Sequence, residues 1–297
     1  MTGNPAAPQD TAKPEQDAPD PRSRPSDPVA TDDEPQSAAD GPANVARVYD
    51  ALLGGKDNYA CDRAAAARLV AAVPGAPQAA RDNRAFLSRA VRYLAGQGIT
   101  QFLDIGSGLP AAGPVHHVAR EHCPDPHVAY VDHDPVVVAH ARALLAGSPH
   151  ITAIPADLRY PRSLLTMREV RDVIDLSQPA GVLLVAVLHF LADADRPRDL
   201  VQAITARLAP GSYLALSHVT ADHLAPGAAQ AAAAAYDGAS APGVPRTRED
   251  IARFLDGLQI IPPGITDVTA WRPGRGHGLR AAGPPLFYGG IGRIPPR

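Results

Sequence analysis

Beyond residue 100, short apolar runs alternate with amphipathic segments along the chain. The apolar runs are typical of buried strands, which we predict at 101–105, 127–131, 151–154, 181–187 and 212–217. The segments between them have apolar residues at helical spacing and predict helices at about 113–122, 135–146, 163–172 and 196–208. The fourth run is continuously apolar, as in a central parallel strand covered on both faces. The alternation predicts an α/β protein with a doubly wound, mostly parallel, Rossmann-like sheet.

Helical patterns flank this core on both sides. Before it, three helices are predicted to form an N-terminal helical cap at 43–97, and they cover about 44–53, 62–72 and 78–95. Asn44 can cap the first of them, and Gly54 can end it. After the fifth strand we predict helices at 228–236 and 247–255, then two β-like runs that pair as a terminal hairpin, at 265–271 and 286–291. With these two runs the predicted sheet is seven-stranded.

Composition changes near residue 43. Residues 1–42 are rich in Pro, Asp, Ala and Ser and have almost no large apolar side chains. Such a segment cannot bury enough surface to offset its chain entropy. We therefore predict a disordered, acidic, Pro-rich tail at 1–42 and one folded domain at 43–297.

Charge and hydropathy exclude several function classes. The net charge of −3 argues against a nucleic-acid partner. No apolar run approaches the roughly 20 residues of a membrane span, and the N-terminus has no apolar signal core. These observations predict a cytoplasmic protein without a membrane partner. Cys61 and Cys123 lack metal-ligand spacing, so we predict neither a metal site nor a disulfide.

The stretch from Asp104 to Pro110 leads out of the first predicted strand through a glycine-rich turn. Gly106 and Gly108 have no Cβ, which permits a sharp bend and the close approach of a ligand to the backbone. We expect free N–H groups after the turn to favour an electron-rich ligand. Asp104 lies two residues before the first glycine, where its carboxylate can reach the amino group of a methionine moiety.

Acidic residues also follow the second and third predicted strands. Asp132 comes about 24 residues after Gly108, close to the spacing expected of an acid that accepts hydrogen bonds from a ribose diol. Asp134 competes for this role, but it is better placed to cap the helix that follows. Asp157 can accept a hydrogen bond from an adenine amino group, and Leu158 can cover the adenine ring. The alternative for Asp157 is a loop acid without function.

Together these features predict a nucleoside-containing cofactor. Gly106, Gly108 and Ala111 satisfy the relaxed dinucleotide fingerprint, which alone is a weak signal. Three features favour S-adenosylmethionine: the position of Asp104, the roughly 60 ordered residues before the turn, and a terminal hairpin in place of a second parallel half. A nicotinamide or flavin dinucleotide, or a site that binds nothing, is the alternative.

His189 directly follows the fourth predicted strand, at the sheet edge where ligands of open α/β sheets bind. It is a candidate base for methyl transfer, and the alternative is a histidine bonded to backbone that only shapes the pocket. For His218, at the end of the fifth strand, the structural role is favoured. Polar residues also cluster between Arg47 and Tyr59 and predict a cap that closes over a ligand, with a solvated helix end as the alternative.

Taken in order, these motifs resemble the actinobacterial S-adenosylmethionine-dependent methyltransferase family that was long classed as a domain of unknown function. The resemblance spans about residues 43–294 and rests on the segments 46–50, 53–59, 83–87, 101–110, 130–135, 156–159, 188–190, 209–214, 217–218 and 271–273. The chain departs from the family pattern at 113–117, where Pro114 removes a backbone donor and His117 replaces an acid.

The resemblance implies a class I methyltransferase fold with S-adenosylmethionine as cofactor. It implies cofactor contacts from the glycine turn, the two strand-end motifs and the cap, namely Asp104, Gly106, Ser107, Gly108, Asp132, His133, Asp157, Leu158, Arg47, Tyr49 and Lys56. The predicted activity is methyl transfer to an oxygen or nitrogen of a small-molecule acceptor, with His189 as the candidate catalytic residue.

Missing motifs narrow the acceptor. The chain has no Asn-Pro-Pro-Tyr sequence, which disfavours methylation of base amino groups, and no cysteine in a strand-end loop, which disfavours attack on pyrimidine carbon. Because no full acid–base set is evident, a cofactor-binding regulatory module without turnover is the first alternative, and an NAD(P)-dependent oxidoreductase is the second. The sequence leaves the oligomeric state open, a homodimer included.

Overall fold

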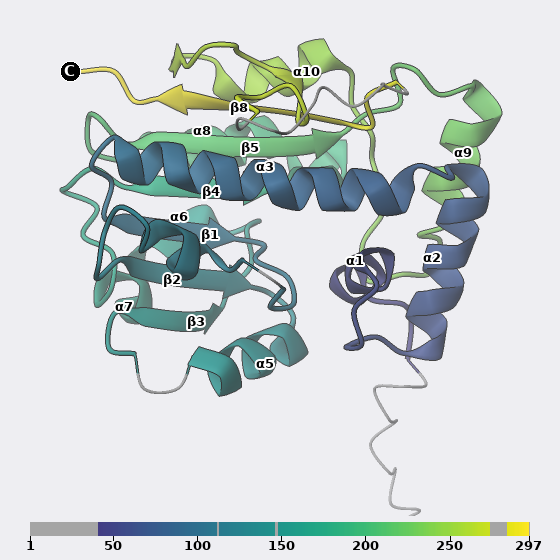
Figure 1. Ribbon diagram of the computed structural model, residues 1–297, viewed down its shortest axis with the longest axis horizontal. Helices are drawn as coiled ribbons and strands as arrows, with labels where there is room; N and C mark the ends of the chain where they lie inside the picture. Colours follow the sequence, from purple (N-terminus) through teal and green to yellow (C-terminus); the bar gives the residue numbers. More distant parts are fainter. Residues whose placement is uncertain (1–40, 112, 146–147, 274–283, 297) are drawn as a thin grey trace, which may run out of the picture. The chain divides into compact units, whose positions relative to one another are not determined.

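The computed structural model describes residues 41–111, 113–145, 148–273 and 284–296. In these ranges an eight-stranded sheet has the order β3-β2-β1-β4-β5-β8-β6, with β7 paired to β8 (Figure 1). The first five strands are parallel, and the later ones pair antiparallel. The strands are β1 (Gln101–Ile105), β2 (His127–Asp132), β3 (Ile151–Pro155), β4 (Gly181–Val185), β5 (Tyr213–Val219), β6 (Gln259–Ile260), β7 (Thr266–Asp267) and β8 (Phe287–Arg293).

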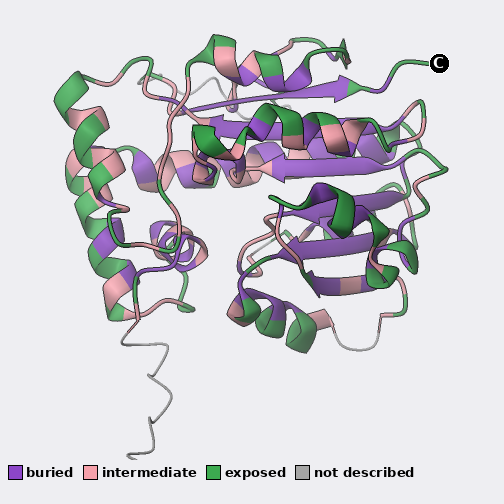
Figure 2. Ribbon diagram, turned by 180° about the vertical axis from the view of Figure 1, so that it is seen from behind, coloured by how far each residue is buried: buried purple, intermediate pink, exposed green. Residues whose placement is uncertain are grey.

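Helices cover both faces of the sheet, and the strands between them are buried along most of their length (Figure 2). One face packs against α3 (Ala76–Gly96), α4 (Val115–Ala119) and α5 (Pro135–Leu145). The other packs against α6 (Pro161–Thr166), α7 (Arg168–Arg171), α8 (Pro197–Thr205) and α10 (Arg248–Ala252). This is the predicted doubly wound arrangement. None of the helices in the described ranges is long and apolar enough to cross a membrane.

The remaining helices gather beside the carboxyl ends of the parallel strands (Figure 1). They are α1 (Val45–Leu53), α2 (Ala60–Ala72) and α9 (Pro226–Ala234), which share a small apolar cluster with the start of α3. As predicted, the Asn44 side chain caps α1 by accepting from the amides of Ala46 and Arg47, and Gly54 ends it with a φ of 80°. The predicted cap therefore corresponds to α1, α2 and α3.

The long helix α3 both closes the cap and lies along the sheet. Its fit depends on a glycine in β8, because a Cβ at Gly289 would lie 2.9 Å from the ring of Phe86. This close approach sets the position of α3 on the sheet. It thereby places Asn83 and Arg84, which precede Phe86 on the helix, at the edge of the sheet where the parallel strands end.

Several predicted boundaries are wrong. The strand expected at 181–187 ends at Val185, because Ala186 takes a left-handed φ of 57° and the chain turns into a 3₁₀ helix at Leu188–Phe190. The helix expected at 163–172 is divided at Met167, whose ψ of 139° is extended. The helix expected at 113–122 is only α4. The sheet gains an eighth strand, the two-residue β6, which is too short to give an alternating pattern.

The predicted terminal hairpin is partly confirmed, because β7 and β8 pair antiparallel although β7 has only two residues. β8 also pairs with β5 along its whole length. The disordered tail predicted at 1–42 lies outside the described residues except for its last two positions.

Candidate functional site

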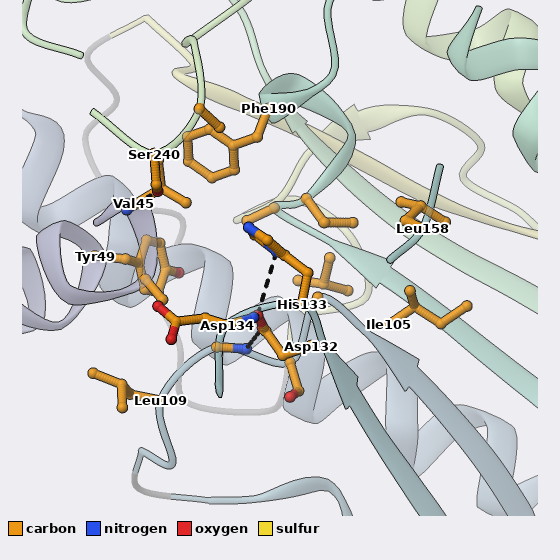
Figure 3. Close-up of a pocket in the computed structure, with 18 of the residues that line it drawn as sticks. Val45, Tyr49, Ile105, Leu109, Asp132, His133, Asp134, Leu158, Phe190 and Ser240 are labelled. Atoms are coloured by element: carbon orange, nitrogen blue, oxygen red, sulfur yellow. Dashed lines mark hydrogen bonds and ion pairs between the residues drawn. The ribbon is translucent and has the colours of Figure 1, made fainter. Parts of the chain in front are cut away.

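A pocket with a cavity volume of about 220 Å³ lies where β1, β2 and β4 end. The turns after these strands form one side of it, and the cap and a loop at 240–242 form the other (Figure 3). Most of the predicted cofactor-binding residues line this pocket: Tyr49, Asp104, Gly106, Ser107, Gly108, Asp132, His133, Asp157 and Leu158.

The glycine turn forms the bend that the sequence predicts. Gly106 and Gly108 have φ values of 74° and 65°, in the left-handed region that favours glycine. A Cβ at Gly106 would lie 2.3 Å from a methyl carbon of Val187, so this position also needs glycine for space. The expectation of free N–H groups concerns the residues after this turn, whereas the amides of the turn itself are bonded within the protein. The amides of Gly106 and Ser107 donate to the carbonyl of Val131, and the amide of Gly108 donates to Asp132.

Asp104 is the buried acid of the pocket. The residue is only 5% exposed, because it lies within β1, which has a neighbouring strand on each side. Burial raises the pKa of Asp104 from 3.8 to about 7, and the negative charge of Asp132 acts in the same direction. The positive charge of Arg84, which also lines the pocket, opposes this rise. A cationic ligand group placed here would stabilise the carboxylate.

Asp132 holds the end of β2 in a fixed geometry. Its Oδ2 accepts the amide of Gly108 at 2.9 Å, and its Oδ1 accepts the amide of Asp134 at 3.0 Å. Burial raises the pKa of Asp132 above its ordinary value, although these two hydrogen bonds oppose the rise. Each carboxylate oxygen accepts one backbone bond and retains lone-pair capacity for a ligand hydroxyl.

Asp134 takes the structural role that the sequence favours for it. Its Oδ1 accepts the amide of Val136 at 2.7 Å, in the first turn of α5. Its Oδ2 accepts a hydrogen bond from the side-chain amide of Asn44. The residue that caps α1 is thus also the residue that ties the cap to the turn after β2.

Asp157 follows β3 at the pocket wall and is bound to Arg159. The guanidinium nitrogens Nε and Nη2 of Arg159 approach its Oδ2 at 2.9 and 2.6 Å. Burial works against ionisation of Asp157, but the hydrogen bonds and charge of Arg159 outweigh it and lower the pKa below its ordinary value. Leu158 is buried beside it. His133 is half-exposed on the same side, with its Nδ1 3.6 Å from Asp132.

The cap contributes Tyr49 to the pocket but not the other two predicted residues. The hydroxyl of Tyr49 donates to the carbonyl of Ala80 at 3.0 Å and accepts from the amide of Asn83 at 3.0 Å. Arg47 instead forms a buried ion pair with Asp62 at 2.7 Å. Lys56 is exposed on the loop after α1.

Neither Arg47 nor Lys56 is among the lining residues. The physical reason differs between the two residues. The side chain of Arg47 is held in an internal ion pair, and Lys56 lies on an exposed loop. Pocket geometry therefore gives no support to their predicted cofactor contacts.

His189 lies beside this pocket without lining it, on the 3₁₀ helix after β4. It is 6% exposed, and among the described residues no hydrogen-bond partner is found for its buried Nδ1. Burial, helped by the charges of His218 and Arg246, lowers the pKa of His189 well below its ordinary value, so the ring is neutral at pH 7.

His218 has a partner for each ring nitrogen. Its Nδ1 lies 2.7 Å from the carbonyl of Val219, which identifies this nitrogen as the donor, and its Nε2 accepts from Arg246 at 3.0 Å. Burial lowers the pKa of His218 to about 3. This arrangement fits the structural role that the sequence favours for it.

Some lining residues escape the sequence analysis. Val187 and Ser240 border the pocket from outside the motif segments, and Phe190 lies in the motif segment 188–190 but was not predicted as a site residue. Ser240 reaches it because its amide donates to the carbonyl of Ala43 and its hydroxyl accepts from the amide of Val45. Contacts between residues almost 200 positions apart leave no local signal in one sequence.

The pocket residues fit the parts of S-adenosylmethionine. A buried acid matches an ammonium group, an acid at the end of β2 matches a ribose diol, and an acid followed by a buried leucine matches an adenine edge and face. The bend at Gly106, which a Cβ would fill, gives space for close approach. The described residues include no group of three or more His, Cys, Asp or Glu that could hold a metal ion.

Comparisons with known proteins agree with this geometry. Residues 32–295 match the sequence pattern of a family described as S-adenosyl methyltransferase. A crystal structure from Thermobifida fusca YX, described as a methyltransferase, is 39% identical, with a TM-score of 0.78 over 86% of this chain and 96% of that one. A DUF574 family protein from Streptomyces avermitilis MA-4680 is 36% identical, with a TM-score of 0.81 over 86% and 98% of the two chains. No curated protein matches the chain.

Proposed function

The chain belongs to the S-adenosyl methyltransferase family, and from this premise we propose that it methylates an oxygen or nitrogen atom of a small-molecule acceptor. S-adenosylmethionine is the cofactor and supplies the methyl group from its sulfonium. The observation that carries the proposal is the meeting of a buried acid, a Cβ-free bend and a strand-end acid in one pocket, with a neutral histidine beside it.

Each acid of the pocket has a distinct role in this proposal. Asp104 binds the ammonium group of the cofactor, and the bound cation keeps the carboxylate ionised near neutral pH. Asp132 accepts hydrogen bonds from the ribose hydroxyls, because its orientation is already fixed by the amides of Gly108 and Asp134. Asp157 accepts from the adenine amino group in addition to Arg159, and Leu158 covers the ring. Such pre-set orientation lowers the barrier mainly through positioning.

His189 is the proposed proton acceptor. Transfer of a methyl group to a hydroxyl or amine releases a proton, which a neighbouring base can accept. Burial keeps the imidazole neutral at pH 7, so one ring nitrogen has a lone pair available. His218 and Arg246 lie behind it and hold the chain after β4 in place, because Arg246 also donates to the carbonyls of Leu188 and Leu191.

Cofactor binding is tested by calorimetry with S-adenosylhomocysteine. The wild-type protein is expected to bind it, and Asp132→Asn is expected to weaken binding by about tenfold or more, because a hydrogen bond to a charged partner contributes about 1.5–3 kcal/mol. Asp172→Asn, on the exposed end of α7, is the matched control and should bind as the wild type does. No heat of binding at ligand concentrations up to about 1 mM, the upper end of typical KM values, would contradict the assignment.

Methyl transfer is tested with cofactor carrying a deuterated methyl group. The protein is mixed with the small-molecule fraction of a cell extract, and mass spectrometry searches for metabolites that acquire the label. His189→Gln should lose most of the labelling while it still binds S-adenosylhomocysteine, since general base catalysis contributes about 10²–10⁴-fold. His117→Gln changes an exposed histidine on α4 and is the control. Undiminished labelling by His189→Gln would remove this residue from the mechanism.

A further inference from the structure

A second cavity, which we call the apolar chamber, adjoins the cofactor pocket. It has a cavity volume of about 90 Å³ and lies between the cap helices, α9 and the ends of β5 and β8. Tyr49 and Phe190 line both cavities, so the two cavities meet at these side chains. His189 lines the chamber but not the cofactor pocket. A molecule in the chamber would therefore approach the cofactor next to Tyr49 and Phe190, beside His189.

The chamber wall is almost entirely apolar. None of the described residues that line it is charged, and α9 presents a row of alanines, among them Ala229, Ala232 and Ala233. An ionised ligand would lose its hydration here without gaining a counter-charge, which is costly. The occupant of the chamber is thus expected to be uncharged.

Few polar groups in the wall are available to a ligand. The hydroxyl of Tyr49 is bound to Ala80 and Asn83, and the hydroxyl of Thr220 accepts the amide of Asp222. The hydroxyl of Tyr236 and the buried Nδ1 of His189 differ, because neither has a hydrogen-bond partner among the described residues. A buried polar atom without a partner is costly in free energy and is rare in folded proteins. A ligand with one hydroxyl can meet the need of this imidazole.

Aromatic rings surround the same point. The ring centroid of His189 lies 4.2 Å from that of Phe190 and 5.9 Å from that of Phe287. The rings of Phe190 and Tyr236 meet edge-on, with their centroids 5.6 Å apart. Aromatic side chains in these tilted arrangements present both faces and edges to a further ring. At about 90 Å³ the chamber is smaller than the roughly 150 Å³ of an apolar cavity that binds benzene, so its volume excludes an occupant larger than a single ring.

We propose that the apolar chamber is the acceptor site and that the acceptor is an uncharged, single-ring aromatic compound whose one hydroxyl group hydrogen-bonds to His189. This inference rests on the proposed function, because it assigns the acceptor of that reaction. The inference goes beyond the proposed function by naming the cavity, the chemical class of the acceptor and the residue that hydrogen-bonds to its hydroxyl.

The test measures binding of 4-fluorophenol by ¹⁹F NMR, with and without saturating S-adenosylhomocysteine. The wild-type protein should bind this probe in about the millimolar range expected of so small a ligand, and 4-fluorobenzoate, which is charged, should bind at least about tenfold more weakly. Failure of S-adenosylhomocysteine to bind would count against the proposed function, whereas the fluorophenol titration without it reports on the chamber alone.

Two variants of α9 locate the bound probe. Ala232→Leu fills the chamber and should weaken 4-fluorophenol binding by at least about tenfold, while the affinity for S-adenosylhomocysteine stays within about twofold. Ala231→Leu makes the same change at the adjacent exposed position and should leave both affinities unchanged. Circular dichroism melting verifies that both variants fold.

A third variant tests the hydroxyl contact independently of the size of the chamber. His189→Phe keeps an aromatic ring but removes the lone pair, so the preference for 4-fluorophenol over fluorobenzene should fall by about tenfold. The inference is overturned if 4-fluorophenol does not bind, if Ala231→Leu and Ala232→Leu weaken it equally, or if His189→Phe retains the wild-type preference.

Discussion

Replacing Asp104 with Asn removes a carboxyl group that the fold keeps buried, and the consequence is measurable as a change of stability with pH. Asp104 is 5% exposed within β1. Burial raises its pKa from 3.8 to about 7 in the cofactor-free protein, with a smaller contribution from Asp132. The folded protein therefore holds this proton more tightly than the unfolded chain does. Stability is expected to fall as the pH rises from 3.8 to about 7.

The magnitude follows from the size of the shift. One pKa unit corresponds to about 1.36 kcal/mol. Integrating the titration of one group with pKa 3.8 when unfolded and about 7 when folded gives a loss of about 2–3 kcal/mol between pH 5 and pH 8. Asp104→Asn has no group to titrate there. Its stability relative to the wild type should therefore rise by about 2–3 kcal/mol over the same interval.

The assay is urea denaturation of both proteins at pH 5, 6, 7 and 8 without cofactor. Taking the difference cancels His189 and His218, whose lowered pKa values make both proteins less stable as the pH falls below about 6.5. Asp157→Asn is the control. Its lowered pKa places its stability contribution above pH 3.8, lost only on further acidification, so its difference from the wild type should be flat from pH 5 to 8.

The argument that burial holds this group neutral would be refuted if the difference in unfolding free energy between Asp104→Asn and the wild type stayed constant from pH 5 to 8. Constant here means within about 0.5 kcal/mol, the usual spread of additive effects. The same variant should bind S-adenosylhomocysteine weakly at pH 8, because it lacks the carboxylate proposed to bind the ammonium group. In the wild type, affinity should rise from pH 5 to 7, because binding then displaces a smaller fraction of protons from Asp104.

Three further predictions concern the cap and the glycine turn. Asp62→Ala leaves the buried guanidinium of Arg47 without its partner and should lower the unfolding free energy by about 3–5 kcal/mol in urea titrations; an effect below 1 kcal/mol would mean that the pair behaves as a surface pair. Asn44→Ala removes the cap of α1 and the contact from the cap to the turn after β2, and should cost about 1–2 kcal/mol by the same method. Gly108→Ala should cost about 1–2 kcal/mol, because Gly108 has a left-handed φ but open space where a Cβ would lie. Gly106→Ala should destabilise the protein more, because its Cβ would also meet Val187. Equal losses in thermal melts would show that backbone strain alone, and not the contact with Val187, makes Gly106 necessary.

Local patterns explain why much of the fold could be predicted. The continuous apolar run of β4 indicates a strand buried on both faces, and the sheet places it at the centre. Asn44 and Gly54 mark the ends of α1 because capping depends on a few adjacent residues. The boundaries failed where a local rule was overridden, as at Ala186, whose left-handed backbone conformation no sequence pattern predicts.

For the site, the sequence predicted the residues that follow strands, because parallel strands end at one edge of a sheet and bring their turns together there. It was less informative about the cap. Arg47 lies in a polar segment typical of a ligand-binding cap, yet the fold pairs its guanidinium with Asp62. Whether an arginine binds a ligand or forms an internal ion pair depends on distances that exist only in the folded chain. Lys56 likewise projects into solvent.

The sequence by itself thus determined the order of strands and helices, the glycine bend and the acids Asp104, Asp132 and Asp157, because each is encoded by near neighbours along the chain. Only the tertiary structure decided which cap residues reach the pocket and that a separate apolar chamber lies beside His189. That chamber is built from α1, α2, α3, α9 and the ends of β5 and β8, and its lining residues run from Tyr49 to Phe287. Its shape and lack of charge arise from long-range packing, which no local pattern records.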